Sequence, residues 1–170
     1  MITIDMTRRE GTQGVALVEC SNKRKQTYIV RTDVKPNVTE ETPNGVTFIE
    51  GRFDHKPTMA EVKAFVLEVI DEQVKLKIIS GMVWQEKPVW LSVENQLNFA
   101  HATAPVTLKI GEDADMTAIY HAFRTTAELE AFNAACNAWK QQCLTDGWQE
   151  KDAVNWEEYE EQLESEVENV

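Results

Sequence analysis

The stretch from Gly81 to Trp90, GMVWQEKPVW, decides how the middle of this chain folds. Trp84 and Trp90 stand on either side of the short polar segment Gln85-Glu86-Lys87-Pro88. Apolar runs that flank a polar turn are typical of a β-hairpin. Proline donates no ladder hydrogen bond, so Pro88 belongs at the turn or at an edge.

The residues that follow, LSVENQLNFA, predict a short helix over Asn95–Ala102, opened by Ser92 or Glu94. Beyond it, alternating apolar residues in 106–110 and 116–123 are separated by the acidic turn 111–115, which predicts a second hairpin.

Two longer helices flank these hairpins, and each starts with a capping box. Thr58 with Glu61, and Thr125 with Glu128, have the spacing at which each residue of the pair satisfies a free amide of the other. The first helix is expected to end near Gly81 and the second at Gly147, because glycine commonly terminates helices. Apolar residues three or four apart mark the buried faces: Val62, Phe65, Val66, Val69 and Ile70 in the first helix, and Leu129, Phe132, Cys136, Trp139 and Cys143 in the second.

The N-terminal third is rich in β-forming residues. Residues 15–20 and 26–31 flank the turn-forming cluster 21–25 and predict a hairpin, and 45–53 predicts a further strand after a loop over 34–44. The expected fold class is therefore α+β, with antiparallel hairpins, two long amphipathic helices and an acidic C-terminal helical tail. The expected parts are an N-terminal antiparallel β region (1–56), a helix–hairpin–hairpin–helix unit (57–154) and the acidic tail (155–170).

Length and composition describe an ordinary globular chain. With 170 residues and 42% hydrophobic residues, it has room for one domain or two very small ones and enough apolar content to fold. No window resembles a membrane span, and the N-terminus lacks a secretory signal, so we expect synthesis in the cytoplasm and no membrane partner. The three cysteines, Cys20, Cys136 and Cys143, are expected to be buried thiols without a disulfide.

The charge is acidic overall and concentrated near the C-terminus. The net charge is −12, and residues 140–170 hold ten acidic and two basic side chains. Such a surface repels phosphate, which makes nucleic acid an unfavourable partner.

Motifs for catalysis are absent from the sequence: the nucleotide-binding, hydrolase and EF-hand patterns all fail. His55 follows Asp54, which is compatible with a metal or acid–base site but is more typical of surface residues. His121 lies in a predicted strand and is expected to be packed there. We therefore expect no enzyme activity, no catalytic or metal site and no cofactor.

The two hairpin tryptophans leave two interpretations open. Trp84 and Trp90 would form a carbohydrate-stacking platform if they faced each other across the hairpin on its exposed side. They would instead form the core if a helix covered them.

The acidic tail has a narrow apolar seam. Seven glutamates fall between Glu157 and Glu168, and four apolar residues recur at helical spacing: Trp156, Tyr159, Leu163 and Val167. Repulsion between like charges makes such a helix marginal alone, so it needs a partner or its own domain to dock on. These four residues are the predicted partner-binding residues. Trp148 and Trp156 are expected to anchor the C-terminal segment by packing against the rest of the protein.

Long segments of the chain resemble a family. Residues 53–58, 79–84, 89–98, 105–109, 120–123 and 146–152 look like a recurrent domain of uncharacterised function found in virion- and tail-associated proteins of Bacteroidales phages and prophages, over residues 45–156. The usual Trp-Asn-Gly turn of that domain is replaced here by Trp84-Gln85-Glu86.

The resemblance implies a phage structural protein, a tail- or head-associated virion component that binds other virion proteins in a multi-copy or homo-oligomeric assembly. It supplies no catalytic residues. The alternative function is a carbohydrate- or receptor-binding module of a phage fibre or tail tip that uses Trp84 and Trp90.

Overall fold

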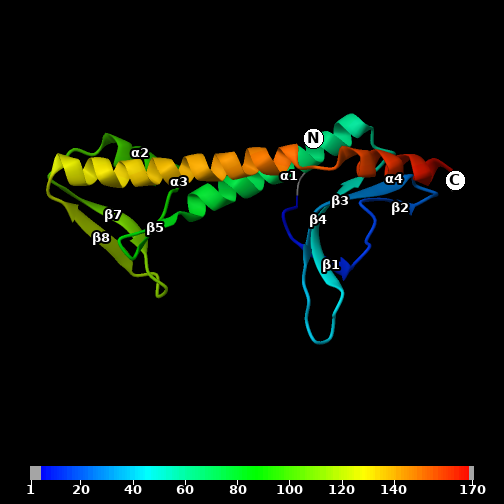
Figure 1. The fold of residues 1–170 in the computed structure, drawn as a ribbon, viewed down its shortest axis with the longest axis horizontal. Helices are drawn as coiled ribbons and strands as arrows, with labels where there is room; N and C mark the ends of the chain where they lie inside the picture. The colour runs from blue at the N-terminus through cyan, green and yellow to red at the C-terminus, as the bar shows by residue number, and fades with distance from the viewer. Residues whose placement is uncertain (1–4, 169–170) are drawn as a thin grey trace. The chain divides into compact units, whose positions relative to one another are not determined.

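The predicted α+β class is confirmed in a computed structural model that describes residues 5–168, with side chains described for 5–166. In this range the structure has four helices and three antiparallel sheets (Figure 1). The chain divides into two compact units. Unit 1 comprises the residues up to Ile70 and those from Ala153 onward, and unit 2 comprises Asp71–Asp152.

These units differ from the predicted parts in two ways. The first half of the first long helix belongs with the N-terminal sheet, and so does the C-terminal acidic segment, which the predicted division lists as a separate part. The physical reason is that neither the sheet face nor the apolar seam of the acidic segment can be buried alone.

Unit 1 is built on a four-stranded antiparallel sheet with the strand order β1-β4-β3-β2. The strands are β1 (Arg9–Thr12), β2 (Val18–Asn22), β3 (Thr27–Pro36) and β4 (Gly45–Phe53). The two edge strands of this sheet are β1, which pairs with β4, and β2, which pairs with β3. In β3 the ladder extends beyond the predicted strand to Pro36, with an irregularity between Thr32 and Lys35.

Two helices pack on this sheet. The helix α1 (Met59–Ser80) starts at the predicted capping box: the Thr58 amide donates to Glu61 at 2.8 Å, and the Glu61 amide donates to Thr58 Oγ1 at 3.3 Å. The rings of Phe53 in β4 and Phe65 in α1 meet edge to face at 6.3 Å, which places this part of α1 against the sheet. The second helix is α4 (Trp156–Glu168), and the Lys63 ammonium lies over the Trp156 ring at 5.6 Å.

Unit 2 contains the tryptophan hairpin, β5 (Met82–Trp84) and β6 (Lys87–Val89), followed by α2 (Val93–His101), whose N-cap is Ser92. Gly81 separates the hairpin from α1 with φ of +84°, a conformation in which a side chain would be strained. Gln85 and Glu86 both have positive φ, 47° and 62°, as a type I′ turn requires. The hairpin thus turns as Asn-Gly hairpins do, although it lacks that dipeptide.

A second hairpin and a long helix complete unit 2: β7 (Val106–Glu112), β8 (Ala118–Phe123) and α3 (Thr126–Asp152). The buried core of this unit comprises Val89, Leu91, Phe99, Ile110, Phe123, Leu129, Phe132 and Cys136. The predicted end of α3 at Gly147 is wrong. The helix continues through Gly147, where the missing side chain leaves room for Val74 of α1. A Cβ at this position would lie 2.3 Å from Val74 Cγ2.

Candidate functional site

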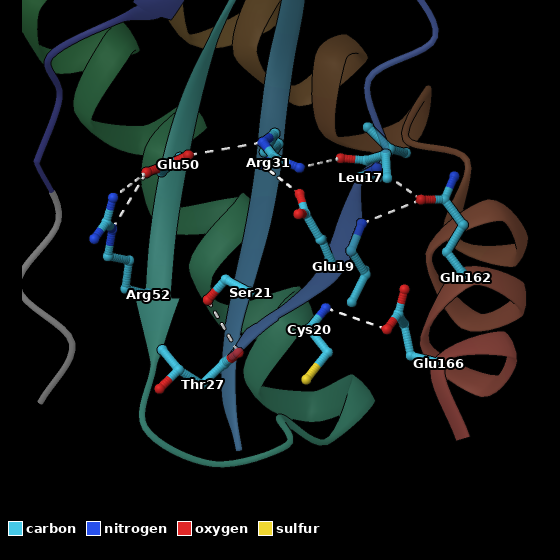
Figure 2. Close-up of polar contacts among 12 residues, drawn as sticks. Leu17, Glu19, Cys20, Ser21, Thr27, Arg31, Glu50, Arg52, Gln162 and Glu166 are labelled. Carbon is cyan, nitrogen blue, oxygen red and sulfur yellow. Dashed lines mark hydrogen bonds and ion pairs between the residues drawn. The ribbon is translucent and has the colours of Figure 1, made fainter. Parts of the chain in front are cut away.

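A long-range polar contact in unit 1 joins α4 to the sheet edge formed by β2, and Figure 2 shows it in close-up. The side-chain oxygen of Gln162 accepts hydrogen bonds from the backbone amides of Leu17 (2.6 Å) and Val18 (3.1 Å). Glu166 accepts a third from the Cys20 amide at 3.3 Å. An edge strand exposes such amides to pairing by other chains, and here side chains of a helix satisfy them.

At the start of β2, α4 also replaces part of the strand ladder. The Arg31 amide donates to the Leu17 carbonyl at 2.7 Å, as in an antiparallel pair. The two remaining groups of this pair are bonded to α4 instead: the Leu17 amide to Gln162, and the Arg31 carbonyl to the Tyr159 hydroxyl at 2.9 Å. Burial raises the pKa of Tyr159, so its hydroxyl keeps the donated proton.

We call the groups that receive α4 the α4 seat: the amides of Leu17, Val18 and Cys20 and the carbonyl of Arg31. Tyr159 and Leu163 are both buried here. These two predicted partner-binding residues therefore contact the protein's own unit 1 and are not exposed to a partner while α4 occupies the seat. Trp156 is half-buried beside Lys63, and the side chain of Val167 lies outside the described residues.

A row of alternating charges crosses the sheet beside the seat (Figure 2). The guanidinium of the buried Arg31 bonds Glu19 at 2.7 Å and lies 3.7 Å from Glu50, which in turn pairs with Arg52 at 3.0 Å. Arg31 also donates to the Ala16 carbonyl at 2.8 Å. Carboxylates on both sides offset part of the cost of burying the cation, and removal of either one would leave the buried charge less compensated.

The hairpin tryptophans do not lie opposite each other. Trp84 pairs across the hairpin with Lys87, and its ring packs edge to face on Phe132 at 5.0 Å. Trp90 lies beyond the hairpin, 41% exposed, and its amide donates to the Ile110 carbonyl at 2.9 Å. Of the two open interpretations, this geometry supports the core for Trp84 and leaves Trp90 without a facing tryptophan.

His121 lies beside Trp84 and has two polar partners. Its Nε2 is 2.9 Å from Glu128 and its Nδ1 is 3.2 Å from the Lys87 ammonium. Because an ammonium can only donate, Nδ1 accepts and Nε2 carries the proton given to Glu128. Glu128 also accepts from the Arg124 amide, one residue earlier than the capping box predicts, and the bond to His121 holds its pKa below the ordinary value. This arrangement joins the hairpins to the start of α3.

His55 is held between two carboxylates on the surface of unit 1. Its ring nitrogens lie 2.9 Å from Asp54 and 3.0 Å from Glu61. These hydrogen bonds, that of Asp54 before that of Glu61, raise the pKa of His55. No group of three or more residues suited to hold a metal ion occurs among the described residues.

The cysteines are free in the structure. Burial raises the pKa of Cys136 to about 11 and also raises that of Cys143. Thiols that stay protonated are poor nucleophiles, so these two behave as apolar core residues. Cys20, on the sheet edge, is half-buried.

Cavities lie in both units. One of about 390 Å³ lies in unit 1 at the loop between β3 and β4, lined mainly by apolar groups such as Val34, Val38 and Pro43. Another, of about 220 Å³, lies in unit 2 between α2 and α3, beside Gln96 and Asn133. Both amides are already bonded to backbone carbonyls, Gln96 to that of Leu91 and Asn133 to that of Phe99.

Exposed apolar side chains gather at α2 in unit 2. Val93 and Leu97 are one helical turn apart and are 63% and 55% exposed, and the exposed Trp90 lies three residues before the start of the helix. We call these three residues the α2 face. The other side of α2 carries the buried Phe99. Trp148, expected to hold the C-terminal segment down, is 54% exposed on α3 instead.

The sequence did not predict that Gln162 and Glu166 cap the β2 edge. It also did not predict that Arg31 is a buried cation. The position of Arg31 next to apolar residues of a strand predicts an exposed side chain, and no local pattern indicates an edge cap that comes from more than 140 residues away. None of the helices in 5–168 has the combination of length and apolar character that a membrane crossing needs. No protein-family model matches the chain, and neither the curated proteins nor the solved structures gave a match.

Proposed function

We propose that this chain is a phage structural protein, a tail- or head-associated virion component that acts by protein–protein contact and is present in multiple copies. Its partners in this proposal are other virion proteins. The assignment to phage rests on the sequence resemblance over residues 45–156. The proposed mode of action rests on the surface of unit 2.

The observation that carries the proposed mode of action is the α2 face. A domain this small gains stability by burying large apolar side chains, so exposed ones that stand one turn apart on a helix are typical of interaction surfaces. Tryptophan is also among the residues most enriched where interfaces bind most strongly. Trp90, Val93 and Leu97 thus form the surface proposed to contact another virion subunit.

The proposal moves the partner-binding surface away from the acidic tail. Tyr159 and Leu163 are buried within unit 1, whereas Trp90, Val93 and Leu97 of the α2 face are all exposed. The net charge of −12 favours a protein partner over nucleic acid.

A particle-incorporation experiment tests this function. Phage particles are produced in a host that expresses a tagged copy of the chain, either wild type or with Val93→Asp and Leu97→Asp, and the tag is quantified in purified particles. Aspartates placed in an apolar interface lose their hydration without gaining partners, so incorporation should fall about tenfold or more. The matched control carries Glu94→Ala and Asn98→Ala, exposed polar positions on the same helix, and should incorporate like the wild type.

Two results would contradict the proposal at different levels. Normal incorporation of the doubly substituted chain, with folding verified by circular dichroism, would remove the α2 face from it. A wild-type chain missing from particles would remove the virion function itself.

A further inference from the structure

The helix α4 packs in unit 1 but follows unit 2 along the chain. The chain leaves unit 1 within α1, runs through unit 2, and returns through the residues between Asp152, which ends α3, and Trp156, which starts α4. Residues 153–155 are therefore the whole connection between α3 and α4. Every contact between α4 and the α4 seat is non-covalent.

The α4 seat recognises α4 in detail. It combines two buried side chains, Tyr159 and Leu163, with the bonds from Gln162 and Glu166 to backbone amides of the β2 edge. Any helix that fills the seat must bring an acceptor to each amide and a hydroxyl to the Arg31 carbonyl. Among the described segments, α4 carries this set, and the α4 of every other copy carries the same set.

Outside the seat, α4 is unfavourable as a helix. Residues 156–168 contain seven glutamates and no lysine or arginine, and several glutamates are three or four residues apart. Like charges at these spacings repel, and a helix of 13 residues is marginal in water even without them. An undocked α4 is therefore driven to the nearest vacant seat, and it leaves behind an open β2 edge that needs cover.

We propose that α4 is exchanged between copies, so that the α4 of one chain occupies the α4 seat of a second chain. The exchanged contacts are identical to those within one chain, which makes exchange an inexpensive route to oligomers, and short hinges such as 153–155 favour it. Reciprocal exchange gives a closed dimer, and exchange in one direction gives a running array. This inference rests on the proposed multi-copy assembly and names the element that links the copies.

Thiol cross-linking in the full chain tests the exchange. In the Glu166→Cys chain the new thiol lies against Cys20, since Glu166 bonds the Cys20 amide at 3.3 Å. The purified chain is concentrated, separated by size, and each fraction is treated with a short bis-maleimide before denaturing electrophoresis. Links within a chain run at monomer mass and links between exchanged chains at dimer mass.

Dimer-mass links are expected in the oligomeric fraction of the Glu166→Cys chain. They should be lost in the Glu164→Cys control, which places the thiol on an exposed position of the same helix. Oligomers that hold only links within a chain would overturn the exchange and leave the proposed virion function intact. A chain that stays monomeric at every concentration would also overturn the exchange.

Hinge variants keep every contact of the seat and provide a second test. An insertion of four residues, Gly-Ser-Gly-Ser, after Val154 lets α4 reach its own seat more easily, so the dimer should be lost. Deletion of Ala153 and Val154 hinders that return and should raise the dimer share. Equal dimer shares for the two hinge lengths would overturn the proposal, because an interface unrelated to α4 is insensitive to this hinge.

Discussion

The hydroxyl of Tyr159 donates a hydrogen bond to the backbone carbonyl of Arg31 at 2.9 Å, across 128 residues of sequence. Tyr159 lies in α4 and Arg31 in β3, a central strand of the unit 1 sheet. Both residues are buried, so the bond is shielded from water. The C-terminal acidic segment is therefore part of the unit 1 core and not an appendage.

Tyr159→Phe should lower the stability of the chain. The substitution keeps the ring but leaves the Arg31 carbonyl without this donor, and an unsatisfied buried group costs about 1–3 kcal/mol. Chemical denaturation, monitored through amide hydrogen exchange of unit 1 residues, measures the loss in the free energy of unfolding. The control is Tyr120→Phe on the exposed side of β8, expected to change stability by no more than about 0.5 kcal/mol. Equal effects of both substitutions would contradict the structural role of this hydroxyl.

Leu163→Ala and Leu97→Ala should differ widely although they are the same chemical change. Leu163 is a buried residue of α4, and its truncation is expected to cost about 2–5 kcal/mol. Leu97 is on the exposed α2 face, and its truncation should cost no more than about 0.5 kcal/mol. Thermal unfolding of both variants measures the difference. A stable Leu163→Ala chain would show that α4 is not packed as described.

Gly147→Ala tests the close approach of α3 and α1 within unit 2. In an exposed helix this change stabilises by about 1 kcal/mol. Here the new methyl group would overlap Val74, so a loss of about 1–3 kcal/mol is expected.

The matched background for that test is Val74→Ala, which removes the obstructing methyl groups. In this background Gly147→Ala should lose most of its cost. Denaturant unfolding of the four chains gives the coupling between the two positions, and purely additive effects would refute the contact.

His55 gives unit 1 a specific pH dependence. Its folded-state pKa is raised above the ordinary 6.5, first by the hydrogen bond of Asp54 and then by that of Glu61. Its contribution to stability is therefore fully present below pH 6.5 and is lost as the pH rises through the raised pKa. NMR titration of the ring should show the midpoint falling in Asp54→Asn but staying in Glu40→Gln, a change in an exposed loop. An unchanged midpoint in Asp54→Asn would contradict the pairing.

The tryptophans separate the core interpretation from sugar binding. Trp84→Ala should cost about 3–5 kcal/mol because Trp84 packs on Phe132 and Phe123. Trp90→Ala should cost less, because much of its ring is exposed. Fluorescence titration with a glycan panel completes the comparison. A saturable shift that Trp90→Ala abolishes would favour the carbohydrate-binding module.

Most secondary structure could be predicted from local sequence. The capping box of Thr58 and Glu61 forms as the spacing indicates, and a strand forms over 45–53 as predicted. The strand predicted over 106–110 extends to Glu112, into the segment predicted as a turn. The tryptophan hairpin forms too. Its two turn residues, Gln85 and Glu86, have positive φ, which their residue types do not predict. The candidate site was less predictable, since Gln162 and Glu166 resemble any other polar residues of an acidic helix.

By itself, the sequence determined the helices, the hairpins and the acidic character, because capping, alternation and charge act over a few neighbouring residues. Only the tertiary structure decided that α3 continues through Gly147, where Val74 fills the space a side chain would take. It also decided that Tyr159 and Leu163 are core residues and that Trp90, Val93 and Leu97 stay exposed. Burial depends on which distant surfaces meet, and a helical apolar seam has the same pattern whether it covers its own sheet or another protein.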